Sequence, residues 1–241
     1  MYRAGFTSSI FYRYLAPLMS LAVAGCSSGT GAILQTVSNV VPRGASAAQA
    51  RLDPNFRYLR VTIDGRIALL ALGYIEPASP APVEVWYSAE REVLRFQSGR
   101  LVGATGLPTE WRNVKLPDLP TWSVLARHDE PLHWIRGRDV MPGYRYGISD
   151  ALTLRPIQAP ARSALEGIDP QQLAWFEETS QNEMGISGSR AAAADKVVRL
   201  PPARYAVDLR AGREEAVYGE QCLSVDVCFT WQRWSAQGDS R

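Results

Sequence analysis

The sequence predicts a mainly β protein, either an antiparallel sandwich or a barrel-like meander, with one or two short helices. Many short segments alternate apolar and polar side chains, which is typical of strands with one buried face. Dipeptides that favour two-residue turns, such as Asp64-Gly65 and Ser98-Gly99, separate several of these segments. Signals for helices are sparse. Together these observations favour antiparallel strands joined by short connections.

The N-terminal segment, residues 1–25, has the layout of a bacterial export signal. Arg3 and Arg13 are followed by an apolar stretch, and no acidic residue precedes Cys26. The stretch is shorter than the roughly 20 residues of a membrane-spanning helix, and Pro17 interrupts it. This segment is therefore predicted to be a signal peptide that is removed.

The end of that segment, Val23-Ala24-Gly25-Cys26, is similar to the lipobox of bacterial lipoproteins. This likeness implies cleavage before Cys26, acylation of its thiol with fatty acids such as palmitate, and acylation of the new amino terminus. Two or three acyl chains anchor a protein stably, whereas one does not. Aspartate directly after the cysteine favours retention in the inner membrane, and this chain has Ser27 instead. We therefore predict a lipid anchor in the cell outer membrane, with the folded part facing the periplasm.

Residues 26–50 are mostly small and polar and predict a tether between the acylated cysteine and the folded part. Residues 51–241 then form the predicted β-rich periplasmic domain. Nothing after residue 26 is apolar and long enough to cross a membrane, so the acyl chains are the only membrane contact that the sequence predicts.

Four segments in the first half of this domain predict strands. Residues 58–76 and 83–106 each alternate around one of the two turns named above, and each predicts a hairpin. Brief strands are expected at 111–114 and 122–126, between loops that are rich in proline.

The second half predicts further paired strands. Turns are expected at Arg136-Gly137 and Pro142-Gly143, and an exposed loop is expected at residues 182–198. The end of the chain again alternates apolar and polar residues around a turn at Ala211-Gly212.

The clearest helix signal begins at Asp169, which can cap a helix N-terminus. Pro170 suits the first helical position. Leu173, Trp175 and Phe176 then offer an apolar face, so the sequence predicts a helix here.

Charge and composition exclude some classes of protein. The chain has 26 basic and 24 acidic residues, and two of the basic residues lie in the predicted signal peptide, so the remainder is balanced. A nucleic-acid-binding protein would normally show a basic excess on one face. We therefore do not expect this protein to bind nucleic acid. A hydrophobic content of 46% with seven tryptophans is enough for a substantial core.

Cys222 and Cys228 are candidates for a disulfide, which the oxidising periplasm permits. Six extended residues cover about 20 Å, whereas a disulfide needs Cα atoms about 5.5 Å apart, so a turn through Ser224 to Asp226 is required. Two buried thiols are the alternative, and the sequence leaves both open. As a metal site the pair is weak, because it lacks close spacing and a nearby histidine.

The sequence predicts no catalytic set, metal site or cofactor. His128 and His133 are five residues apart, so they do not share a strand face, and Pro131 prevents a regular helix between them. Glu177-Glu178 and Glu214-Glu215 are sequence neighbours whose side chains diverge, so neither pair can flank a scissile glycosidic bond alone. We expect both acidic pairs to be solvated surface.

Tryptophan faces can stack on sugars, although most tryptophans are expected in the core. Trp111 and Trp122 lie beside proline-rich loops and are the candidates for glycan contact. Arg91, Arg95 and Arg100 could meet an acidic polysaccharide, but a solvated strand face is the favoured interpretation.

Residues 86–111, WYSAEREVLRFQSGRLVGATGLPTEW, contain a strand that ends in Trp86, a turn, a second strand, and an ATGL segment that leads to Trp111. In this arrangement the sequence resembles the YjbF/GfcB family, the group 4 capsule lipoproteins of Gram-negative outer membranes. The lipobox and the β end with tryptophan and cysteine agree in order. The resemblance implies a role in making or exporting a capsular or extracellular polysaccharide beside an outer-membrane export apparatus. It implies no reaction and brings no catalytic residue.

We therefore expect a non-enzymatic outer-membrane lipoprotein that assists the production or secretion of capsular or extracellular polysaccharide. Its expected partners are the membrane, through the acyl chains, and outer-membrane polysaccharide export proteins, with the polysaccharide itself as a candidate. The alternatives are a periplasmic polysaccharide-modifying hydrolase and a purely structural envelope lipoprotein. A cleft with two carboxyls about 5–10 Å apart would favour the hydrolase.

Overall fold

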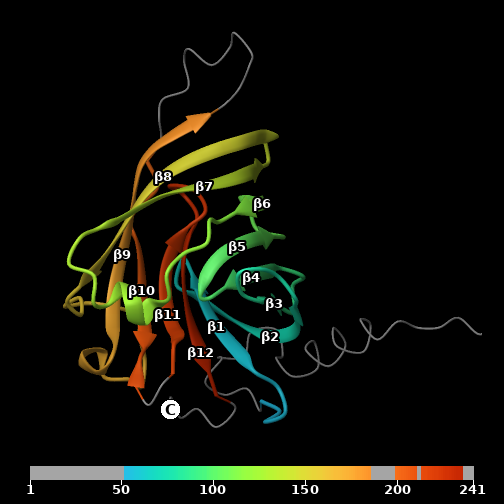
Figure 1. Ribbon diagram of the computed structural model, residues 1–241. Coiled ribbons are helices and arrows are strands. Elements are labelled where there is room, and N and C mark those ends of the chain that lie inside the picture. Colours follow the sequence, from blue (N-terminus) through green and yellow to red (C-terminus); the bar gives the residue numbers. More distant parts are fainter. Residues whose placement is uncertain (1–51, 186–198, 211–212, 236–241) are drawn as a thin grey trace, which may run out of the picture.

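The computed structural model describes residues 52–185, 199–210 and 213–235 (Figure 1). Within them the chain forms a closed antiparallel barrel in which each strand pairs with its neighbours in sequence and β1 closes on β12. The strands are β1 Tyr58–Ile63, β2 Arg66–Glu76, β3 Val83–Tyr87, β4 Val93–Gln97, β5 Arg100–Thr105, β6 Glu110–Lys115, β7 Leu132–Met141, β8 Arg145–Ile157, β9 Ala174–Gly185, β10 Ala203–Asp208, β11 Glu215–Cys222 and β12 Cys228–Trp234. The predicted mainly β fold is confirmed in its barrel form.

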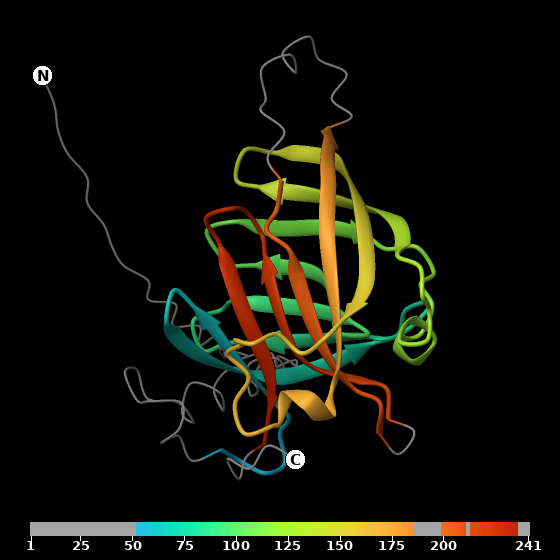
Figure 2. The same ribbon diagram turned by 90° about the vertical axis from the view of Figure 1, so that its left-hand side faces the viewer.

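The strands form two groups that cross over a shared core. In Figure 2 the strands β9–β12 cross the strands β3–β6 at a steep angle. The pairing of β5 with β6 is short, because it consists of one residue pair, Ala104 with Trp111, in the described part of the barrel. The long connection from β6 to β7 leaves the ring at this side.

Three of the turns expected from local sequence are confirmed. Asp64-Gly65 and Ser98-Gly99 join β1 to β2 and β4 to β5, and all four residues have positive φ, as two-residue hairpin turns require. The turn at Pro142-Gly143, between β7 and β8, is also confirmed. The turn expected at Arg136-Gly137 is wrong, because both residues lie inside β7 and pair with β8. The expected turn at Ala211-Gly212 lies outside the described residues.

The helix expected from Asp169 begins as expected and then stops. The Asp169 carboxylate accepts a hydrogen bond from the Gln171 backbone N–H at 3.0 Å, and Pro170–Gln172 form one 3-10 turn. The chain then enters β9, where Trp175 and Phe176 face opposite sides of the sheet. Both sides of β9 are covered here, so the apolar run belongs to a strand and the helix prediction beyond this turn is wrong.

The strand expected at 122–126 is instead the short helix α2, Trp122–Leu125. The Trp122 ring enters the core, with its centroid 4.8 Å from that of Phe176 and 5.3 Å from that of Tyr205. Its indole N–H donates to the Ser98 carbonyl at 2.9 Å. These contacts fix α2 against the barrel.

Among the described residues, no helix is long and apolar enough to cross a membrane.

The barrel interior contains an ion network as well as apolar side chains. Arg136 and Arg138 both donate to the fully buried Asp150, with Nε to Oδ2 distances of 2.9 and 2.7 Å. The Trp111 ring lies under both guanidinium groups, at 4.4 and 4.7 Å from its centroid. Burial alone would raise the Asp150 pKa, but the hydrogen bonds and charges of the two arginines outweigh it and lower that pKa.

Glu178 is the second buried carboxylate of this interior. It accepts a hydrogen bond from Arg136 Nη1 at 3.3 Å, and burial raises its pKa. Its neighbour Glu177 lies on the opposite face of β9 and accepts a hydrogen bond from the exposed Arg155 at 2.8 Å. The expectation that both glutamates are solvated is therefore wrong for Glu178.

The structure joins Cys222 and Cys228 in a disulfide. The two residues are direct partners in the pairing of β11 with β12. The hairpin between them is closed by a hydrogen bond from the Leu223 N–H to the Val227 carbonyl at 2.8 Å.

The two matched hairpin glycines separate backbone strain from packing. Gly65 and Gly99 have φ of +75° and +78°, but a Cβ on Gly65 would meet nothing within 4 Å, whereas one on Gly99 would overlap Ala216. We expect Gly65→Ala to lower the free energy of unfolding by about 1 kcal/mol. Gly99→Ala should cost roughly 2–4 kcal/mol, because overpacking adds to the strain. Urea unfolding followed by tryptophan fluorescence measures both, and equal losses would contradict this packing.

The neighbouring glutamates should give opposite pH dependence. The pKa of Glu178 is raised on folding, so its favourable contribution is complete below its usual pKa of about 4.3 and is lost as pH rises through the folded value. Relative to wild type, Glu178→Gln should gain stability between about pH 4 and pH 8. Unfolding free energies measured across this range test it, and parallel profiles would contradict the burial of the carboxylate.

Glu177→Gln is the matched control. The hydrogen bond from Arg155 lowers the pKa of Glu177, so this contribution is present above the usual pKa and is lost as pH falls. The wild type should exceed this variant by roughly 0.5 kcal/mol near neutral pH, because the pair is at the surface. That advantage should disappear toward about pH 3.

Candidate binding pocket

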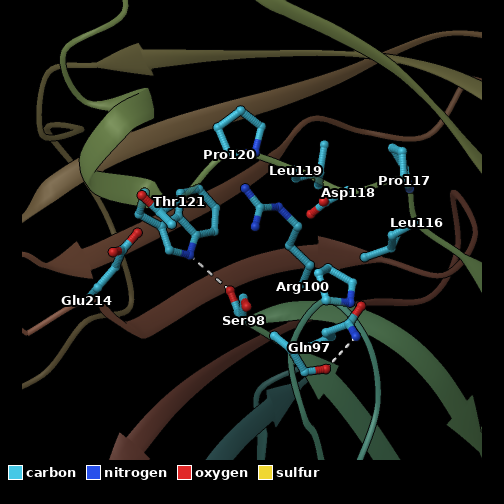
Figure 3. A pocket seen from close by; sticks show the side chains of 13 residues that line it. Gln97, Ser98, Arg100, Leu116, Pro117, Asp118, Leu119, Pro120, Thr121 and Glu214 are labelled. Carbon is cyan, nitrogen blue, oxygen red and sulfur yellow. Dashed lines mark hydrogen bonds between the residues drawn. The ribbon is translucent and has the colours of Figure 1, made fainter.

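A pocket of about 370 Å³ lies where the turn between β4 and β5 meets the loop that leads to α2 (Figure 3). Its volume falls within the range of small-molecule sites, about 300–1,000 Å³. The pocket is formed by the loop between β2 and β3, the end of β4 with its turn into β5, the start of β5, the loop from β6 into α2, and the residue before β11. It is lined by Pro80, Ala81, Gln97, Ser98, Arg100, Leu116, Pro117, Asp118, Leu119, Pro120, Thr121, Trp122 and Glu214.

The walls of this pocket are held by hydrogen bonds. Gln97 Nε2 donates to the Ala81 carbonyl at 2.6 Å and fixes one loop to the end of β4. Glu214 accepts from the Ser123 backbone N–H at 3.1 Å and also from its hydroxyl, which holds the start of α2. Pro117 and Pro120 restrict the backbone between these supports. The pocket is therefore built on restrained walls.

Arg100, the first residue of β5, forms the inner wall and is only 4% exposed. Its guanidinium carbon lies 3.8 Å from the centroid of the Trp122 ring and 5.7 Å from that of Trp134. Its Nε and Nη2 are buried without a hydrogen-bond partner. Figure 3 shows the side chain rising from the strand toward Asp118 and Pro120. Within the described part of the chain, no hydrogen bond or ion pair reaches this cation.

The charge of Arg100 is only partly balanced by its surroundings. Burial lowers its pKa, and the more distant carboxylates of Glu178 and Glu214 oppose this effect. Aromatic faces attract a guanidinium, but they do not replace its hydrogen bonds. The side chain therefore keeps unused donors beside a pocket.

Asp118 supplies the complementary group. It is exposed on the loop wall and makes no hydrogen bond within the described residues. The pocket thus combines unused donors from Arg100 with an unused acceptor from Asp118. A polyhydroxylated ligand offers both partners at once.

The structure places the two candidate tryptophans differently. Trp111 is 2% exposed, and its indole N–H donates to the Leu223 carbonyl at 2.9 Å, so its ring offers no face to a sugar. Trp122 lines the pocket, but it is also 2% exposed, and Arg100 covers its ring. A glycan in this pocket would therefore meet the arginine before the indole.

Sequence reasoning did not find the main group of the pocket. The solvated face expected for Arg91, Arg95 and Arg100 is wrong for Arg100, which turns inward and packs on Trp122. A register shift in the pairing of β4 with β5, between Arg95 and Phe96, interrupts the alternation that such a prediction uses. The sequence signal that sets Arg100 apart is its position directly after the two-residue turn Ser98-Gly99.

The remaining candidate residues lie elsewhere. His128 Nδ1 lies 3.2 Å from the Glu130 carbonyl, and His133 Nδ1 lies 3.0 Å from the Thr153 hydroxyl, with both histidines exposed. Across the described ranges, no group of three His, Cys, Asp or Glu residues is placed to hold a metal ion. Cys26 lies outside the described residues, as do the predicted signal peptide and tether.

Comparison with known proteins agrees with this architecture. No curated protein matches the chain. The crystal structure of the hypothetical lipoprotein YmcC from Escherichia coli K12 is similar in fold, with a TM-score of 0.58 and 13% sequence identity over 85% of this chain and 97% of that chain. Residues 47–180 match the family described as group 4 capsule polysaccharide lipoprotein gfcB, YjbF. Because this segment is more than half of the sequence, the protein belongs to the GfcB/YjbF family of group 4 capsule polysaccharide lipoproteins.

Proposed function

We propose that the protein is a non-enzymatic outer-membrane lipoprotein that assists the production or secretion of a capsular or extracellular polysaccharide. The observation that carries the proposal is the family match over residues 47–180. The lipobox at Cys26 supports a lipid anchor, and Ser27 after it supports the outer membrane. The domain acts there through contacts with export proteins or with the glycan.

The chemistry of the pocket supports a binding role over hydrolysis. Glycoside hydrolysis uses two carboxyl groups, one of which protonates the leaving oxygen. Glu214 is committed to the backbone N–H and hydroxyl of Ser123, so Asp118 is the carboxylate of this pocket without a partner in the described residues. A single free carboxylate beside a buried cation suits recognition better than cleavage of a glycosidic bond.

The hairpin between β7 and β8 supports contact with a protein partner. Tyr144 and Tyr146 lie at its tip and are 73% and 57% exposed. Tyrosine gives a large contact area at a low cost in conformational entropy, and it is enriched at protein interfaces. This tip is the surface that we assign to an export protein.

Deletion of the gene tests the proposal. We expect the deletion strain to lose most of its surface polysaccharide and the wild-type gene to restore it. Cys26→Ala at matched expression should not restore it, because the chain can no longer be acylated. Surface polysaccharide is measured by quantitative staining, and acylation by the mass of the purified protein. Normal polysaccharide in the deletion strain would contradict the function.

Ser27→Asp is the matched control for location, because it preserves Cys26 while favouring the inner membrane. We expect this variant to be acylated, to fractionate with inner membranes and to restore little polysaccharide. Full restoration from the inner membrane would contradict the outer-membrane placement. Release of reducing ends from purified polysaccharide by the wild type, but not by Asp118→Asn, would favour the hydrolase.

A further inference from the structure

We propose that the pocket beside Arg100 binds a carboxylate-bearing sugar unit of an acidic polysaccharide, and that the Arg100 guanidinium pairs with the sugar carboxylate. This inference rests on the proposed function and specifies the glycan class that the pocket recognises. It is carried by a buried cation whose Nε and Nη2 have no partner, in a pocket of suitable volume.

The first step of the argument is the unsatisfied charge. A buried ion is costly unless it is paired and hydrogen-bonded. In the same barrel, Arg136 and Arg138 meet this requirement through Asp150, whereas Arg100 does not. The pocket is therefore the place where a ligand gains most by supplying an anion.

The second step is the shape of the available donors. Nε and Nη2 of an arginine form one edge of the guanidinium, and a carboxylate can accept two parallel hydrogen bonds from such a fork. These are the two nitrogens of Arg100 that lack partners. Both atoms are covered in this structure, so bidentate pairing requires a small shift of the guanidinium itself.

The third step is the charge of the other walls. Asp118 and Glu214 also line the pocket, and two carboxylates disfavour a small free anion. A uronic acid differs from such an anion because its hydroxyl groups can donate to a carboxylate such as Asp118. The combination of one cation with a free acceptor therefore favours an acidic sugar over phosphate or acetate.

Two other hollows of the described structure do not combine these features. One of about 330 Å³ is lined by Arg57 and Arg233, but Arg57 pairs with Glu84 at 3.0 Å and Arg233 pairs with Glu215 at 2.8 Å. Another of about 550 Å³, beside Trp175, has no charged side chain among its described lining residues. The Arg100 pocket is distinguished by a cation that is still unpaired.

Titration calorimetry of the full lipidated chain in detergent tests the inference. The probes are tetramers of galacturonate and of glucuronate, with maltotetraose as the neutral control and sodium acetate as the free anion. We expect at least one uronate tetramer to bind, with weaker binding at high salt. Arg100→Met should lower the affinity for the uronate tetramer at least tenfold. Arg100→Lys should also lower this affinity, because lysine lacks the planar fork of the guanidinium. Arg155→Met, which removes an exposed arginine from β8, should leave the affinity unchanged.

Ala81→Trp keeps Arg100 and fills the pocket from the opposite loop, so it tests the site even where Arg100→Met does not fold. We expect this variant to lose binding at least as strongly. Failure of both uronate tetramers to bind the wild type would overturn the inference. Equal affinity of wild type and Arg100→Met, equal binding of maltotetraose, or displacement of the tetramer by acetate at similar concentration would also overturn it.

Complementation separates this inference from the proposed function. Arg100→Met and Arg155→Met are expressed in the deletion strain, and we expect only Arg155→Met to restore surface polysaccharide fully. Full restoration by Arg100→Met in a strain that needs the gene would overturn recognition at Arg100 and leave the function standing. A deletion strain with normal polysaccharide would instead remove the function on which the inference rests.

Discussion

The closure of β1 on β12 is the constraint on which the rest of the structure depends. Closing twelve strands into one ring leaves no free sheet edge, but it encloses a wider interior than an eight-stranded barrel does. Aliphatic side chains alone fill such a space poorly. The barrel uses Trp86, Trp122 and Trp231, all nearly fully buried, together with long arginine side chains. The arginine side chains that help to fill the interior therefore also bring buried charges into it.

Because an unpaired buried charge is costly, most of these buried charges must be paired within the barrel wall. Asp150 lies between Arg136 and Arg138, and the Trp111 ring covers both guanidinium groups. These three residues join β7 to β8, and the hydrogen bond from Arg136 to Glu178 extends the network to β9. Arg100 differs because it lies at the start of β5, where the helix α2 supplies an aromatic face but no carboxylate. The contrast between paired and unpaired arginines in one barrel gives the pocket its chemical character.

Features that depend on a few consecutive residues could be predicted from the sequence. Asp64-Gly65 and Ser98-Gly99 specify their turns through positive φ, and Asp169 with Pro170 specifies the start of one helical turn. The sequence could not show that Trp175 and Phe176 would each find a buried face, because the covering residues come from distant strands. The burial of Glu178 and Arg100 depends in the same way on which neighbours close the barrel. Half of the pocket comes from a loop that carries no strand or helix signal, so the site could not be assembled from local patterns.

A weak site suits a protein that guides a polymer. One ion pair at the wall of a small pocket gives modest affinity, because binding must still offset the ordering of the ligand and of any loop that moves. A polysaccharide repeats its units, so release of one unit leaves others within reach, and the effective local concentration stays high. Strong retention would oppose export, whereas brief recognition allows the chain to pass. An unpaired Arg100 on restrained walls therefore fits the proposed role, the orienting of an acidic polymer at the membrane, better than it fits storage or cleavage of that polymer.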